Sequence, residues 1–319
     1  VLNEKEDPQT AANTATALLL AIAYSASIGG VGTLVGSPPN ALLAAFVQDQ
    51  FGIEMGFARW MSIGLPVVLV MLPLAWLLLT RVTCPVARRP IPGADEVIKT
   101  EIEALGPMTI EEKRVLAIFV LTALSWVFRP LITAGFPGMG LTDSGIALIG
   151  ALSLFLIPSS KGDGSTLMSW PRAVTLPWGV LLLFGGGLSL AGAISKSGLA
   201  DTIGGSLAGL EGLPTIVLLI AVTSLIVFLT EITSNTATTA VFLPIVATVA
   251  VSAGTAPLEL IVPVALAASC AFMMPVATPP NAIVFSSDML TVAQMAKAGF
   301  LLNLIAIAVI ILINWALVG

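Results

Sequence analysis

The sequence contains no histidine, only two cysteines and one tyrosine, and charged residues make up just 10% of its 319 positions. The absence of histidine removes the commonest general base and metal ligand, which counts against most enzyme classes. Cys84 and Cys270 lie far apart without a CxxC spacing, so they indicate neither a disulfide framework nor a zinc site. No basic stripe with interleaved aromatic residues is present, and nucleic acid is therefore not an expected partner.

Apolar residues dominate what remains. They make up 57% of the chain. The charged fraction of 10% is well below the value of about 25% that is usual in soluble proteins. Apolar runs of about 17 to 25 residues recur, which is the length that crosses a bilayer core about 30 Å thick. We therefore expect an all-α membrane protein with many helices. The predicted segments are 14–35, 61–82, 115–134, 144–157, 176–194, 213–230, 236–253, 257–276 and 299–318.

The distribution of Lys and Arg predicts the orientation. Six of the thirteen basic residues fall between positions 81 and 114, and such clusters mark cytoplasmic loops. Threading the segments outward from this loop places the C-terminus, Gly319, outside. Arg59 and Lys196 are exceptions to the rule. The six residues are Arg81, Arg88, Arg89, Lys99, Lys113 and Arg114.

Two similar motifs interrupt apolar segments: GSPPN at 36–40 and ATPPN at 277–281. Paired prolines end a helix, because proline lacks the amide donor and clashes with the preceding turn. The freed carbonyls and amides are tolerated in a membrane only where they are buried in protein or line an aqueous cavity. In the threading above, the two motifs run in opposite directions, which is typical of inverted-topology repeats that meet at a binding site in secondary transporters. A structural kink is the alternative.

A polar segment, TEITSNT at 230–236, separates two apolar arms. Ser, Asn and Thr are good N-caps, so a helix from Thr236 onward would direct its positive end at a bound carboxylate. The segment is either the tip of a re-entrant hairpin or an ordinary cytoplasmic turn. Glu231 is either a functional intramembrane acid or a partner of nearby amides and hydroxyls. No acidic relay accompanies it, which favours sodium held by neutral oxygens over proton coupling.

Three stretches carry a family resemblance: SIGGVGTLVGSPPNALL (27–43), TEITSNTATTAVFLP (230–244) and MMPVATPPNAIVF (273–285). Through them the chain resembles the divalent anion:sodium symporter family, which takes up dicarboxylates, citrate or sulfate. The resemblance implies a fold with inverted repeats, discontinuous helices and a re-entrant hairpin. The substrate-binding residues that it implies are Ser234, Asn235, Thr236, Ser37, Pro38, Thr278 and Pro279. The sodium ligands that it implies are Thr230, Ser234, Asn235, the carbonyl of Ala277, and Gly36 for a separate sodium ion.

The resemblance also implies sodium-coupled symport of succinate-, malate- or citrate-like anions by alternating access, in the inner (plasma) membrane among its lipids. The family is dimeric, so a homodimer is expected of the complete protein. The family's first hairpin has no counterpart here, and we expect the chain to be a C-terminal fragment. We expect residues 1–50 to end the first repeat, 51–175 to form scaffold helices, and 176–319 to form the second repeat. The alternatives are a permease for sulfate or a metalloid anion, a sodium/proton antiporter and, with less support, an intramembrane enzyme.

Overall fold

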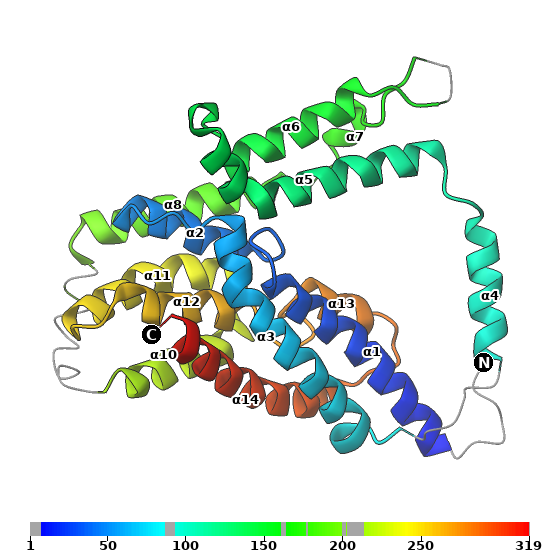
Figure 1. The fold of residues 1–319 in the computed structure, drawn as a ribbon. Helices are drawn as coiled ribbons and strands as arrows, with labels where there is room; N and C mark the ends of the chain where they lie inside the picture. The colour runs from blue at the N-terminus through cyan, green and yellow to red at the C-terminus, as the bar shows by residue number, and fades with distance from the viewer. Residues whose placement is uncertain are drawn as a thin grey trace. The chain divides into compact units, whose positions relative to one another are not determined.

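A computed structural model describes residues 8–86, 93–160, 164–176, 178–199, 202 and 214–318 (Figure 1). The described residues form helices joined by loops, with one isolated bridge between Pro158 and Thr166 in place of any strand. The predicted all-α architecture is confirmed. Residues 1–7, Arg88, Arg89, residue 213 and Gly319, to which the sequence analysis gave roles, lie outside the described residues.

The chain divides into two compact units. The first contains residues 56–58 together with the described residues from 93 to 180. Its core is α5 (Ile110–Gly135) packed against α6 (Asp143–Leu156). A capping box between Thr109 and Glu112 begins α5, and the Thr142 hydroxyl caps α6. The short elements are α4 (Ala94–Leu105), η2 (Pro137–Met139) and α7 (Trp170–Ala173).

The second unit is larger and is built around α12 (Pro257–Ala268). Every residue from Leu260 to Ala268 is buried, as expected for a helix that is apolar on all faces. Figure 1 shows α10 and α14 beside α12, and α11 and α2 also pack on it. The other helices of this unit are α1 (Pro8–Val31), α2 (Pro38–Phe51), α3 (Phe57–Leu77) with the π-helix η1 (Leu78–Thr83), α8 (Gly179–Lys196), α10 (Thr215–Thr230), α11 (Asn235–Ser252), α13 (Pro279–Phe285) and α14 (Val292–Leu317).

Within the described part of the chain, five helices are long and apolar enough to cross a membrane. They are residues 11–31, 57–83, 110–135, 235–252 and 292–317. Shorter apolar helices cover 143–156, 185–194, 215–230 and 257–268. Each predicted apolar segment therefore overlaps a helix, and the chain is a multi-pass membrane protein.

The paired prolines begin helices, whereas the sequence analysis expected them to break helices that continue up to the motif. The predicted segment 257–276 is wrong at its end, because α12 stops at Ala268 and α13 starts at Pro279. Proline disfavours the helical conformation in the residue before it, and Thr278 is accordingly extended (φ −139°, ψ 150°). Proline itself suits the first helical turn, where no amide donor is needed. The result is a loop of ten residues, 269–278, between the two helices.

Candidate functional site

A cavity of about 540 Å³ lies where three segments of the larger unit meet. Pro38 comes from the start of α2, residues 231–236 from the turn between α10 and α11, and Val276, Ala277 and Pro279 from the end of the 269–278 loop. The two proline motifs and the polar segment, which are separate in sequence, thus share the wall of one cavity.

The turn between α10 and α11 is held by its own side chains. The Thr230 hydroxyl donates to Asn235 Oδ1 at 2.6 Å and also lies 3.2 Å from the carbonyl oxygen of Ala268. Ser234 is the N-cap of α11, and its hydroxyl accepts from the amide of Ala237. The helix begins at Asn235, one residue before the predicted start. Its positive end therefore lies at the cavity wall.

Glu231 forms part of the cavity wall, but its carboxylate is fully engaged behind that wall. The residue is 4% exposed. Its Oε1 accepts from the amides of Phe272 (2.8 Å) and Met273 (2.9 Å) and from Asn303 Nδ2 (2.7 Å). Its Oε2 accepts from the amides of Met273 (3.0 Å) and Met274 (3.1 Å). Of the two roles left open for Glu231, this geometry supports a structural partner that fixes the 269–278 loop against the turn between α10 and α11.

Asn281 holds the same loop from the other side. Its Nδ2 donates to the carbonyl oxygens of Ala271 (3.2 Å) and Met274 (3.0 Å). The Thr278 hydroxyl accepts from the amide of Asn281 and so caps α13. Two buried carbonyls that no helix can satisfy thereby find a donor.

Asn40 likewise holds the backbone that leads into α2, at the end of α1 and in the 32–37 loop. Its Nδ2 donates to the carbonyl oxygens of Thr33 (2.8 Å) and Gly30 (3.2 Å). The hydroxyl groups of Ser37 and Ser269 lie 2.8 Å apart, so a hydrogen bond joins the two loops directly. The loops that precede α2 and α13 are therefore each held by an asparagine and linked to one another by a serine pair.

Gly36 allows the first loop to close tightly. A Cβ atom on Gly36 would lie 2.5 Å from the carbonyl oxygen of Gly30, and a Cβ on Gly30 would lie 2.7 Å from that of Gly36. Neither position admits a side chain without moving the backbone.

Six of the residues predicted to bind substrate or sodium line the cavity: Pro38, Ser234, Asn235, Thr236, Ala277 and Pro279. The others, Gly36, Ser37, Thr230 and Thr278, adjoin these in sequence or by hydrogen bonds but are not among the lining residues. Sequence reasoning missed Ser269 and Asn303. Each is a buried polar residue in an apolar stretch, and that signal could have identified both.

Among the described residues, no Lys or Arg side chain lines this cavity, and the one acid that does, Glu231, already binds three amides and Asn303. An anion placed here would need compensation, because an unpaired charge away from water is costly. The available sources are helix N-termini, neutral donors and a cation bound beside the anion.

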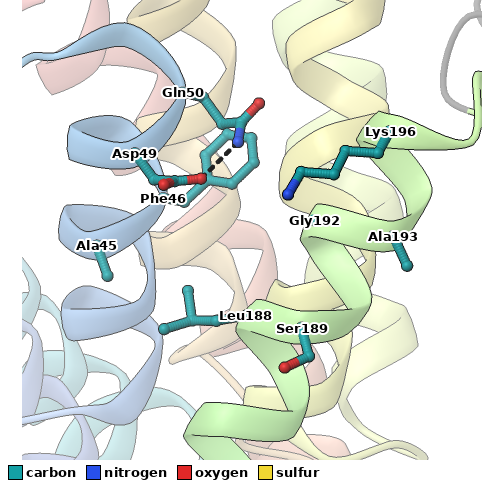
Figure 2. Close-up of a pocket in the computed structure, with 9 residues that line it drawn as sticks. All are labelled: Ala45, Phe46, Asp49, Gln50, Leu188, Ser189, Gly192, Ala193 and Lys196. Carbon is teal, nitrogen blue, oxygen red and sulfur yellow. Dashed lines mark hydrogen bonds between the residues drawn. The ribbon is translucent and has the colours of Figure 1, made fainter.

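A second cavity, of about 580 Å³, lies between α2 and α8. Figure 2 shows Asp49 and Gln50 on α2 facing Lys196, whose side chain reaches from α8 toward α2. Asp49 accepts a hydrogen bond from Gln50 at 2.7 Å. This cavity holds none of the predicted site residues.

Comparison with known proteins identifies the family. A family model described as "Sodium:sulfate symporter transmembrane region" matches residues 1–319. A sodium-dependent dicarboxylate transporter, SdcS, of Staphylococcus saprophyticus is 43% identical over 313 residues, covering 98% of this chain and 60% of the relative. SdcS of Staphylococcus aureus (strain USA300) is 43% identical over 322 residues, covering 98% and 62%. The chain spans about three fifths of the length of these relatives. It belongs to the sodium:sulfate symporter transmembrane family, the group of divalent anion:sodium symporters that its motifs resemble.

Proposed function

We propose that this chain forms the substrate- and sodium-binding part of a secondary transporter that couples uptake of di- or tricarboxylates, such as succinate, malate or citrate, to sodium. One observation carries the proposal: the turn between α10 and α11 meets the starts of α2 and α13 at one cavity, and none of the described residues that line it is basic. A carboxylate could be stabilised there only by helix ends, neutral donors and co-bound cations. That dependence on cations is the physical basis of coupling.

In this proposal the substrate lies between the hairpin tip and the two proline motifs. Ser234, Asn235 and Thr236 bind one carboxylate with the N-terminus of α11, and Thr278 and Pro279 lie close by. Ser37 and Pro38, in the first proline motif, lie on the opposite side of the proposed substrate position and correspond to Thr278 and Pro279. Both proline motifs adjoin the cavity, and this proximity supports the arrangement.

Sodium is the co-transported ion in the proposal. Thr230, Ser234, Asn235 and the carbonyl of Ala277 bind one ion, and Gly36 contributes to a second. Neutral oxygens of this kind suit a hard cation. The Thr230 and Asn235 oxygens, 2.6 Å apart, share a hydrogen bond that a cation bound by both would replace. Without sodium, the Thr230 hydroxyl would thus remain hydrogen-bonded to Asn235.

Alternating access would follow from two inverted repeats, with the binding unit moving against a scaffold. For this purpose we propose that residues 1–50 end the first repeat, that 51–175 form scaffold helices and that 176–319 form the second repeat. We also propose that the complete protein is a homodimer in the plasma (inner) membrane, with the C-terminus outside. The matching hydrogen bonds of Asn40 and Asn281 support the repeat.

A permease for sulfate or a metalloid anion is the main alternative. A sodium/proton antiporter and an intramembrane enzyme have less support, because the described residues that line the cavity include neither a pair of acids nor a nucleophile with its base.

Uptake of labelled succinate tests the proposal. The full-length protein that contains these residues would be reconstituted into liposomes with an inward sodium gradient. We expect accumulation of succinate that stops when potassium replaces sodium. Competition by citrate, malate and sulfate would identify the preferred anion. Equal uptake with and without the sodium gradient would contradict the proposal.

A further inference from the structure

A pair of serine hydroxyl groups within the larger unit joins the two loops that precede α2 and α13. Ser269, the first residue after α12, is 3% exposed, and Ser37 is half-buried beside Pro38 of the cavity wall. Their Oγ atoms lie 2.8 Å apart. A serine hydroxyl has a single proton, so only one of the two serines donates in this pair. The identity of the donor decides what Ser37 can offer to a bound anion.

The end of α12 indicates which serine donates. Ser269 Oγ also donates to the carbonyl oxygen of Ala265 at 3.2 Å. In a continuing α-helix the amide of Ser269 would bind this carbonyl, but it donates to the carbonyl of Leu266 instead. Ala265 is fully buried, and a buried carbonyl needs a donor. Because the single proton of Ser269 serves that carbonyl, the proton between the two serines comes from Ser37.

The two proline motifs use their hydroxyl groups differently. Ser37 and Thr278 are the N-caps of α2 and α13, and both are extended, with φ −143° and −139°. The Thr278 hydroxyl accepts from the amide of Asn281 at 3.3 Å. The Ser37 hydroxyl caps no amide of α2, and the amide of Asn40 donates to the backbone carbonyl of Ser37. The Ser37 hydroxyl is therefore not committed to its helix, and it binds Ser269 across the two loops.

We propose that Ser269 is a positioning residue that competes with the substrate for the hydrogen bond donated by Ser37, and so favours release of the anion. The proposal rests on the proposed function, in which Ser37 helps to bind a carboxylate. Without a bound anion, the Ser37 hydroxyl donates to Ser269. A carboxylate is charged and therefore a stronger acceptor, so the Ser37 hydroxyl rotates and donates to the anion when it binds. When the anion leaves, Ser269 accepts the hydrogen bond again.

The size and the sign of the effect follow from this exchange. One hydrogen bond between neutral groups changes an equilibrium constant by about two- to tenfold. Ser269→Ala removes the competing acceptor, so the succinate Kd in saturating sodium should fall by about this factor, and succinate should dissociate more slowly. A purely structural role for Ser269 predicts the opposite sign, because a loosened loop would bind succinate less well.

Two further variants separate the hydrogen bond from packing. Ser269→Cys keeps nearly the same volume but replaces the oxygen with a weak acceptor, so it should lower the succinate Kd as alanine does. This variant also decides the outcome if the alanine variant does not fold. Thr248→Val, near the C-terminal end of α11, is the matched control. Its hydroxyl also donates to a carbonyl four residues earlier, that of Pro244 at 3.0 Å, and its loss should leave the Kd unchanged.

The deciding experiment is a double-mutant cycle in the purified full-length protein, with succinate binding measured in saturating sodium. We expect Ser269→Ala to lower the succinate Kd when Ser37 is present and to have no effect when Ser37 is already alanine. A Kd that is unchanged or raised in the Ser269 variants overturns the proposal while leaving the proposed function intact. The same decrease in the Ser37→Ala background also overturns it, because Ser37 would not carry the effect. If the unsubstituted protein shows no sodium-dependent succinate binding, the proposed function fails and this proposal fails with it.

Discussion

Asn40 and Asn281 make corresponding hydrogen bonds to the backbone that precedes their helices. Each donates from Nδ2 to the carbonyl oxygens of the residues seven and ten positions earlier: Thr33 and Gly30 for Asn40, Met274 and Ala271 for Asn281. Both side chains are fully buried. The two segments that lead into Pro-Pro-Asn are thus held in the same way.

Replacing Asn281 with Ala should weaken sodium binding. The change leaves the carbonyls of Ala271 and Met274 without their donor, at a cost of ~1–3 kcal/mol, and lets the loop that contains Ala277 rearrange. We expect the sodium concentration for half-maximal succinate uptake to rise about fivefold or more. The matched control is Asn314→Ala. Asn314 is also buried, near the C-terminal end of α14, and its side chain donates to the backbone carbonyl oxygen of Glu259. An equal rise in the control would show that the effect is one of general stability.

Replacing Glu231 with Gln should loosen the 269–278 loop. The new amide group would point a donor at backbone amides that now donate to a carboxylate, and buried hydrogen bonds to a charge are worth ~1.5–3 kcal/mol each. The thermal unfolding temperature should fall and the succinate KM should rise. Glu259→Gln, at the first turn of α12, serves as the control and should have little effect on KM. A variant at position 231 with unchanged stability and KM would refute the assigned role.

Gly299 of α14 allows that helix to pack directly on the same loop. A Cβ at this position would collide with the backbone carbonyl of Phe272, and backbone cannot move aside as a flexible side chain can. We expect Gly299→Ala to cost ~1–3 kcal/mol of stability and to reduce succinate binding. Gly29→Ala in α1, where a Cβ would meet nothing within 4 Å, should be neutral. Thermal unfolding of both variants in the same detergent provides the comparison.

Replacing Thr230 with Val should reduce sodium dependence with little loss of packing, because valine has nearly the same shape but no hydroxyl. Thr230 is fully buried and contacts Asn235 Oδ1, a proposed sodium ligand. Thr239→Val is the matched control: Thr239 is also fully buried, but its hydroxyl donates to the backbone carbonyl of Asn235. The sodium response of uptake should shift only in the first variant. A shift of the same size in both variants would argue against a ligand role for Thr230.

The sequence revealed the parts of the site because their chemistry is unusual in an apolar chain. Proline pairs and the Ser-Asn-Thr segment stand out among apolar residues, and helix-capping rules placed the start of α11 within one residue. The same reasoning failed for the end of α12. The loop 269–278 is held because Glu231 and Asn281 bind its backbone groups, and Asn303 in turn donates to Glu231. Glu231 and Asn303 lie on other elements, far from the loop in the sequence.

The α4 helix was also missed. It has twelve residues, several of them charged, and lies within the loop that the basic residues mark as cytoplasmic. A search for apolar runs long enough to cross a membrane does not detect such a helix. The hydrogen bond from the amide of Phe57 to the Asp143 carboxylate could not be predicted either, because nothing in the sequence indicates which acid will accept from the first amide of α3.

The most direct test of the central claim is the affinity of the purified full-length protein for succinate at several sodium concentrations, with potassium keeping the ionic strength constant. Cation and anion are proposed to compensate each other at one cavity, so the succinate Kd should fall as sodium rises, and succinate should tighten sodium binding by the same factor. A succinate Kd that is the same in sodium and in potassium would contradict the account.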